Sequence, residues 1–207
     1  MKAYQLLFPT PIAIADAPEE FKEDHDFLIN TEYVYKDTRY APTSANTYIL
    51  KDRDTPLTKW IQEQVDEFAV EFLATRSKLK ITQAWCLKHE NMEQYLVEHA
   101  HCNSIISGAY YVHAPEGTAD LTFSKGHASS LHPNIIWETD DELVKDRPWT
   151  WEWHTIPVAT GRLVLFPSQL SHGVNPNNNT NMRCVLSFNT WFDGPFGDPT
   201  RLRELKV

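Results

Sequence analysis

Three histidines and one arginine are spaced so that they could build a metal centre beside an anion site. His99 and His101 stand two positions apart. In an extended strand, side chains at positions i and i+2 point to the same face, so both imidazoles can be directed at one point. His172 follows the apolar segment 161–168, where a strand end feeds a loop that can present a further ligand. Because imidazole is the commonest metal ligand of proteins, this pattern favours a three-histidine site.

Arg183 opens the alternating run 183–192, in which one face is apolar and the other is polar. Polar side chains in a strongly β-forming run are expected to line an interior cavity. A guanidinium in such a cavity must be paired, and its fork matches a carboxylate. Two partners are open at this point: an Asp or Glu of this chain in a structural salt bridge, or an anionic co-substrate.

The bulk composition suits one globular domain built mainly from strands. The chain has 207 residues, of which 42% are hydrophobic and 12% aromatic, enough for a sizeable core with a sheet-rich interior. We expect a single domain over 1–207. Within it, a strand and a helix occupy 1–79, the β core 80–192, and a tail that wraps the surface 193–207.

Charge and cysteine content indicate which partners and which cellular compartment to expect. A formal net charge of −9 argues against a nucleic-acid partner. The cysteines Cys86, Cys102 and Cys184 are odd in number and form no CxxC pair, which predicts a reduced, cytoplasmic setting. No segment has the pattern of a signal peptide or a membrane span. Nothing in the pattern indicates an oligomeric state.

Hydrophobic periodicity predicts one clear helix and a series of strands. Thr55 followed by Pro56 is a typical helix start, and apolar residues recur every three to four positions as far as Phe72. Segment 16–50 is expected to be irregular, with short extended pieces. The predicted strands cover residues 1–15, 80–88, 95–101, 105–113, 121–124, 151–156, 162–166 and 183–192. Many short strands without alternating helices favour a sandwich or double-sheet barrel.

A long polar insertion, residues 125–150, interrupts the strand pattern. Insertions of this length are often lids over functional sites. Four tryptophans are candidates for a lid or substrate wall, or alternatively pack under the loop: Trp137, Trp149, Trp151 and Trp153. The other histidines are interpreted as structural or surface residues: His25, His89, His113, His127, His132 and His154.

Three motifs, in order along the chain, resemble a family of iron(II)/2-oxoglutarate-dependent oxygenases found in phages and bacteria. The first is FPTPI at residues 8–12. The second, HxHxxSxxSGxYY, begins at His99 and ends at Tyr111. The third, GxLvlFPSxLxHxVxPN…RxxxSFN, runs from Gly161 to Asn189. The resemblance would place the protein in the cytoplasm of a bacterium or of a phage-infected host cell.

The resemblance implies a double-stranded β-helix, or jelly roll, with iron(II) and 2-oxoglutarate as cofactors. It implies that His99, His101 and His172 are the catalytic metal ligands and that Arg183 binds the far carboxylate of 2-oxoglutarate. His101 stands where the superfamily usually has a carboxylate, so either all three imidazoles or only two of them bind the metal. Many relatives have Ser or Thr two residues after the arginine, where this chain has Val185. Candidates to replace that hydroxyl are Tyr95, Asn103, Ser104, Tyr110 and Ser187.

The activity implied is that of a dioxygenase that hydroxylates a C–H bond while 2-oxoglutarate is decarboxylated to succinate. By analogy with the superfamily, peptidyl proline or another side chain is one substrate class, and a small molecule is another. Two alternatives stay open: a cupin-like three-histidine metalloenzyme that uses no 2-oxoglutarate, and a non-enzymatic jelly-roll module with a binding or structural role. Arg183 separates the oxygenase from the cupin-like enzyme, which has no use for it.

Overall fold

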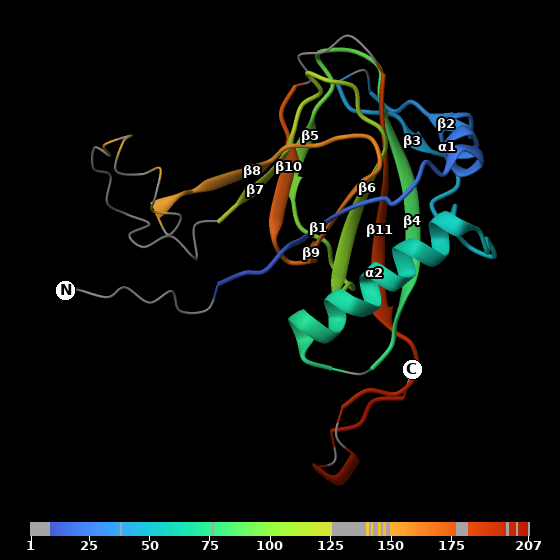
Figure 1. The fold of residues 1–207 in the computed structure, drawn as a ribbon, viewed down its shortest axis with the longest axis vertical. Coiled ribbons are helices and arrows are strands. Elements are labelled where there is room, and N and C mark those ends of the chain that lie inside the picture. Colours follow the sequence, from blue (N-terminus) through green and yellow to red (C-terminus); the bar gives the residue numbers. More distant parts are fainter. Residues whose placement is uncertain are drawn as a thin grey trace.

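Two β-sheets that face each other form the body of the protein (Figure 1). The computed structural model describes residues 9–37, 39–75, 77–125, 140, 142, 145, 147, 150–176, 182–197, 199–201 and 203–206. Within this part, the larger sheet has the strand order β1-β9-β6-β11-β4-β3-β2, and the smaller sheet has the order β5-β10-β7-β8. Neighbouring strands in both sheets run antiparallel. An all-β core with flanking helices, as expected, is therefore confirmed.

The strands and helices have the following bounds. In the larger sheet they are β1 (Ala13–Asp16), β9 (Arg162–Pro167), β6 (Ile106–His113), β11 (Arg183–Phe192), β4 (Leu79–His89), β3 (Thr43–Ser44) and β2 (Tyr33–Val34). In the smaller sheet they are β5 (Leu96–His99), β10 (Ser171–Val174), β7 (Leu121–Ser124) and β8 (Trp153–Ile156). The helices are α1 (Lys22–Ile29), α2 (Pro56–Leu73) and a short 3-10 helix (Pro199–Arg201).

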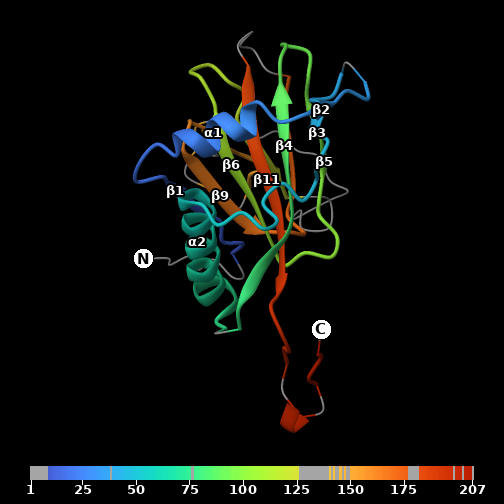
Figure 2. The ribbon, with the colours of Figure 1, turned by 90° about the vertical axis from the view of Figure 1, so that its right-hand side faces the viewer.

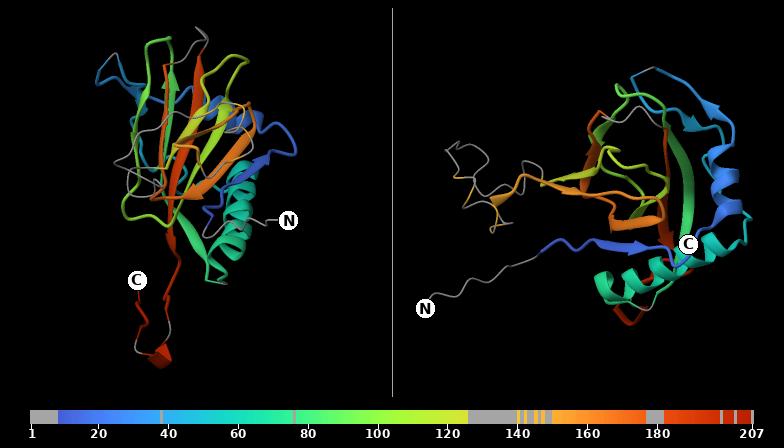
Figure 3. Two further views of the ribbon diagram at one scale, coloured as in Figure 1. Left: turned by 90° about the vertical axis from the view of Figure 1, so that its left-hand side faces the viewer. Right: turned by 45° about the horizontal axis from the view of Figure 1, so that its top comes forward.

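The larger sheet separates two hydrophobic cores, because its side chains alternate between faces. Helix α2 lies across the outer face of this sheet, and the smaller sheet covers the inner face (Figure 3). On β11, Cys184, Leu186 and Phe188 belong to the outer core, whereas Val185 belongs to the inner core. The polar face predicted for 183–192 thus points into the space between the sheets.

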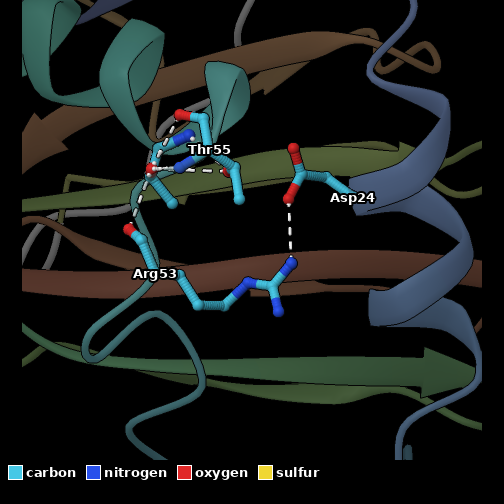
Figure 4. Close-up of polar contacts among 4 residues, drawn as sticks. Asp24, Arg53 and Thr55 are labelled. Atoms are coloured by element: carbon cyan, nitrogen blue, oxygen red, sulfur yellow. Dashed lines mark hydrogen bonds and ion pairs between the residues drawn. The ribbon is translucent and has the colours of Figure 1, made fainter.

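Helix α2 starts where the sequence predicts, and its start is tied to α1. The Thr55 backbone N–H donates to the Thr58 hydroxyl at 2.9 Å, and the Thr58 N–H contacts the Thr55 hydroxyl at 3.4 Å (Figure 4). This reciprocal pair satisfies two N–H groups at the helix end. Just upstream, the Arg53 guanidinium forms an ion pair with Asp24 of α1 at 3.2 Å (Figure 4).

The segment 16–50 and the C-terminal residues differ from expectation. Helix α1 lies in the stretch expected to be irregular. Beyond β11, the chain turns back on itself through a bridge between Phe196 and Leu205, and this hairpin extends away from the sheets rather than wrapping the surface (Figures 1 and 2). No helix in the described part of the chain is both long and apolar enough to span a bilayer.

Candidate active site

The three predicted ligand histidines come together at one edge of the smaller sheet. His99 ends β5 and His172 lies in β10, where the two residues are direct antiparallel partners with ring centroids 4.5 Å apart. The His101 ring lies 5.1 Å from that of His172 and nearly parallel to it, at 5°. One ring nitrogen from each histidine lies within 4.8 Å of the others, close enough to share one cation.

Two local details of the prediction are wrong. His172 belongs to strand β10 and not to a loop. His101 lies beyond the end of β5, so strand alternation does not direct it toward the other two rings. Instead, its backbone N–H donates to the carbonyl oxygen of Ser168, just after β9, at 2.8 Å. This contact with the end of β9 in the larger sheet therefore orients His101 toward the other two histidines.

A chain of hydroxyl groups holds the loop that carries His101. The Ser168 hydroxyl donates to that of Ser104 at 2.7 Å. The Ser107 hydroxyl lies 2.8 Å from both the Ser168 hydroxyl and the Asn189 side-chain oxygen. This network joins the end of β9 to β6 and β11. Ser104 consequently supports the loop and does not line the cavity described below.

Backbone contacts set the tautomer of two of the histidines. The Nδ1 atom of His99 lies 2.8 Å from the carbonyl oxygen of Val97, and Nδ1 of His172 lies 3.0 Å from that of Leu170. A carbonyl oxygen only accepts hydrogen bonds, so Nδ1 carries the proton in both rings. Each Nε2 then presents a lone pair, as metal ligation requires.

The electrostatics of the site keep two of the rings neutral. Burial lowers the pKa of His101 to about 4, and the neighbouring His99 lowers it further in the same direction. Burial likewise lowers the pKa of His172 to about 4, assisted by His99 and His101 and opposed by the contact with Leu170. Unprotonated imidazoles at neutral pH are free to bind a cation. The Nε2 atoms of His101 and His172 already face each other at 3.3 Å.

A cavity of about 100 Å³ between the two sheets adjoins the histidines. Arg183, Val185 and Ser187 of β11 line it, as predicted from the alternation of that strand. Arg183 is only 1% exposed, and its guanidinium lies 5.3 Å from the centre of the Tyr111 ring. Its Nε and Nη1 atoms have no hydrogen-bond partner within the described part of the chain. The structural salt bridge that the sequence left open is not found among the described residues.

Of the five candidates for the missing hydroxyl, Ser187 is the one that reaches the cavity wall. Tyr110 lies in the outer core, with its hydroxyl 2.8 Å from Nε2 of His25. Tyr95 packs beside Tyr40, with ring centroids 5.4 Å apart. Asn103 is exposed, in a left-handed backbone conformation with φ of 54°. These placements, with that of Ser104 above, give no support for contact with 2-oxoglutarate.

Sequence reasoning missed two residues of the cavity wall, His89 and Tyr111. Both are completely buried. His89 was interpreted as structural because it stands alone in the sequence. The available signal was the alternation of β4, which puts Trp85, Leu87 and His89 on one face. This face of β4 lines the cavity only because β11, about one hundred residues later in the chain, pairs beside it, and the sequence does not reveal that pairing.

The predicted lid falls mostly outside the described residues, as do Trp137, Trp149, His127 and His132. Trp151 stacks on His154 at 5.0 Å, with the rings inclined by 7°. Trp153, in β8, is 61% exposed. The stacking of Trp151 on β8 fits its alternative interpretation as a packing residue.

Residues 83–189 match the model of a protein family described as "Putative 2OG-Fe(II) oxygenase". The match runs from β4 to β11, covers more than half of the chain, and includes all three histidines and Arg183. The chain belongs to this oxygenase family. As a 2OG-Fe(II) oxygenase it uses iron(II) and 2-oxoglutarate, and the residues present fit both. Three convergent imidazoles suit the metal, and a buried guanidinium with two nitrogens that no described residue pairs suits a carboxylate.

Solved structures confirm the fold of the oxygenase as a double-stranded β-helix. The α-ketoglutarate-dependent epimerase SnoN from nogalamycin biosynthesis has a TM-score of 0.60 at 12% identity, over 88% of this chain and 78% of its own. AviO1 from Streptomyces viridochromogenes Tue57 has a TM-score of 0.56 at 18% identity, over 89% and 90%. HygX from Streptomyces hygroscopicus, with nickel, 2-oxoglutarate and hygromycin B bound, has a TM-score of 0.56 at 11% identity, over 87% and 82%. Among curated proteins, none matches the sequence.

Proposed function

We propose that this oxygenase hydroxylates a C–H bond of an organic substrate while 2-oxoglutarate is converted to succinate and carbon dioxide. One observation carries the proposal. Arg183 is buried, its Nε and Nη1 atoms have no hydrogen-bond partner among the described residues, and it lines the same cavity as three convergent imidazoles. A cupin-like metalloenzyme or a static binding module would leave this charge uncompensated, at a cost of several kcal/mol.

In this proposal, His99, His101 and His172 hold iron(II) through their Nε2 atoms. The Nδ1 contacts to Val97 and Leu170 orient two of the rings and fix their tautomers. The packing of His101 beside Trp85, with ring centroids 5.8 Å apart, restricts the third ring. When bound, iron(II) and 2-oxoglutarate supply the oxidising power needed to break a C–H bond.

The register of the strands supports a role for Arg183 at the far end of the bound acid. The His101 ring packs against Trp85, which is the direct partner of Ser187 on β11. The Arg183 guanidinium lies over Tyr111, which is the direct partner of Val185. Ser187 and Val185 are two residues apart on an extended strand, which corresponds to roughly 7 Å. That spacing suits a five-carbon diacid held at both ends.

The size of the cavity supports its role as the site of the co-substrate. At about 100 Å³ it is well below the range of roughly 300–1,000 Å³ that is usual for drug-sized ligands. Leu87, Val185 and Phe166 give it apolar walls, which exclude water from around the bound acid. The organic substrate would then approach from the solvent side of the metal, where His99 is half-buried.

The test is iron- and oxygen-dependent formation of succinate from 2-oxoglutarate, which can proceed slowly without the organic substrate. We expect His172→Ala to abolish turnover by removing a metal ligand. Arg183→Leu should abolish turnover but still bind metal. His154→Ala, at an exposed position on β8, is the control and should stay within several-fold of the parent protein. Unchanged turnover in Arg183→Leu, or succinate formation without iron, would overturn the proposal.

A further inference from the structure

We propose that the C-terminal hairpin of one copy of this chain docks beside β1 of a second copy, so that two chains exchange hairpins about a twofold axis. The proposal concerns association and does not depend on the function proposed above. It follows from three features: an open sheet edge beside an apolar groove, carboxylates on the rim of that groove, and a basic hairpin that extends away from its own body.

Strand β1 leaves one edge of the larger sheet open. Its only neighbouring strand in the described part of the chain is β9. Backbone groups of an antiparallel strand alternate in direction, and the Ala17 N–H donates to the Gly161 carbonyl oxygen at 2.8 Å, on the β9 side. The N–H and C=O groups of Ile14 and Asp16 therefore point away from β9. The Ile14 side chain is also 49% exposed, so this edge is a template for an added strand.

A groove of about 170 Å³ lies between β1, β9 and α2. Its apolar walls come from Leu163 and Leu165 of β9 and from Phe68 of α2. Ala13 and Ala15 of β1 also line it, and their small side chains leave the space open. A strand added beside β1 would direct every second side chain toward α2 and this groove. The groove thus adds a side-chain site to the backbone edge.

Carboxylates stand on the α2 rim of the groove. Glu67 and Glu71 line it one helical turn apart, and both are exposed. The ion pairs found for α2 among the described residues are those of Lys59 and Asp66, and neither involves these two carboxylates. Like charges four positions apart on a helix repel each other, so a basic partner is favoured. Pairing of β1 with β1 of a second copy would instead bring two acidic rims together.

The C-terminal hairpin, residues 194–206, brings the complementary charge. Segment 201–206 has three basic residues and one acidic residue, whereas the whole chain has a formal net charge of −9. An isolated two-stranded hairpin is only marginally stable in water, so a hairpin that extends from the body needs a surface to cover it (Figure 2). The described residues of the segment are all exposed: Arg201, Arg203, Glu204, Leu205 and Lys206.

The hairpin has a defined shape and is not a loose tail. Phe196 and Leu205 exchange two backbone hydrogen bonds, of 3.0 Å and 2.8 Å. Gly197, with φ of 99°, lets the backbone of Arg203 come so close that a Cβ atom at this position would clash with the Arg203 carbonyl group. A preformed hairpin loses less conformational entropy on docking than a disordered segment does.

Exchange between two copies closes the assembly. Helix α2 and the hairpin both lie toward the lower end of the molecule in Figure 1, so a twofold axis at that end brings each hairpin toward the groove of the other copy. Two identical contacts then form at once, which doubles the buried area and leaves neither hairpin uncovered. In this dimer the hairpin covers its exposed Leu205 and places Arg203 and Lys206 near the rim carboxylates.

Sedimentation velocity of the full-length protein over a range of concentrations tests the proposal. We expect a dimer that weakens as the salt concentration rises, because its charge pairs are exposed. Removal of residues 194–207 should give a monomer. Glu67→Lys combined with Glu71→Lys should raise the dissociation constant of the dimer roughly tenfold or more, because like charges then face each other. Arg203→Glu combined with Lys206→Glu should have the same effect.

The decisive variant combines all four reversals. It exchanges the signs of the groove and the hairpin, and should restore the dimer to within about threefold of the wild-type dissociation constant. The control is Glu32→Lys combined with Glu93→Lys, which changes the net charge as much as the groove reversal does. Both positions are exposed, and Glu32 precedes β2 at the other edge of the sheet, so association should not change. Circular dichroism checks that every variant is folded.

Three outcomes would overturn the proposal. The first is a wild-type protein that stays monomeric at every concentration. The second is a dimer that survives removal of the hairpin, because β1 or another surface would then make the contact. The third is a folded four-reversal variant that stays monomeric, since these charges would then not face each other. None of these outcomes bears on turnover or nickel binding, so the proposed function is tested separately.

Discussion

At the scale of single residues, the cavity wall includes buried polar groups that have no hydrogen-bond partner among the described residues. Arg183 is the clearest case, because a buried guanidinium is normally paired with a carboxylate, and no described residue supplies one here. His89 is equally buried and has no partner for either nitrogen within the described chain. The free energy that such burial costs in the empty protein can be recovered when an anion binds. This arrangement predicts a ligand-free protein that is sensitive to acid.

We expect acidification to destabilise the ligand-free protein in part through His89. Its pKa is lowered from 6.5 to about 3, so between these values the unfolded chain binds the proton and the folded chain does not. The free energy of unfolding therefore falls as the pH drops below about 6.5, by roughly 2 kcal/mol at pH 5 from this group. Urea denaturation at pH 7.5 and pH 5 measures the loss. His89→Leu should lose less stability than the parent protein, and equal losses would refute this origin.

At the scale of elements, the strands with strong local signals were predictable. Strands β7 and β11 have the predicted bounds, because each is an alternating run of good strand formers between clear turns. Helix α2 was equally visible from its Thr-Pro start and its apolar stripe. The face of β11 that lines the cavity followed from the same alternation.

Other elements depend on neighbours that are distant in sequence. Strand β10 contains Ser171 and Gly173, which are weak strand formers, and it is extended because β5 and β7 flank it. Helix α1 has no side-chain cap at Phe21 and buries Asp24 on its inner face, so its pattern is not that of an amphipathic helix. The predicted metal ligands came from local spacing and a family resemblance. His89 and Tyr111 required knowledge of which strands pair.

Gly173 provides a test of the contact between β10 and β5. A Cβ atom at this position would lie 2.9 Å from the Leu96 carbonyl oxygen and 3.2 Å from the Glu98 nitrogen, which are both backbone atoms of β5. Gly173→Ala must therefore push the two strands apart, and these strands carry His99 and His172. We expect nickel affinity to fall roughly tenfold, as measured by competition with a chelator.

Gly108→Ala is the matched control for this change. Its added Cβ would meet the Phe188 ring in the outer core, so it should lower stability by about 1–3 kcal/mol while nickel affinity is retained. An unchanged nickel affinity in folded Gly173→Ala would show that the spacing of β5 and β10 does not position the ligands.

At the scale of the whole molecule, the two faces of the larger sheet have different tasks. The outer face packs on α2 and forms a conventional hydrophobic core. The inner face and the smaller sheet enclose the cavity, and the histidines lie at its edge. The C-terminal hairpin belongs to neither region and extends away from both (Figure 2). Its described contacts with the body include those of Phe196 with Phe192 and Trp191, whose ring centroids lie 4.3 Å and 6.1 Å away.

We expect removal of the residues after Asp193 to leave the metal site intact. Loss of the aromatic contacts of Phe196 costs about 0.5–1.5 kcal/mol for each pair, which lowers the melting temperature of a chain of this size by only a few degrees. Differential scanning calorimetry and nickel binding measure the two quantities. Loss of nickel binding in the folded, shortened protein would mean that the hairpin contributes to the site.

The most direct test of the central claim is a crystal structure of the protein with Ni(II) and 2-oxoglutarate, since nickel keeps the co-substrate intact in air. We expect nickel at coordination distance from the Nε2 atoms of His99, His101 and His172. The distal carboxylate should contact Arg183, with His89 and Tyr111 beside it. Nickel bound elsewhere, or a guanidinium that makes no contact with the acid, would contradict the account.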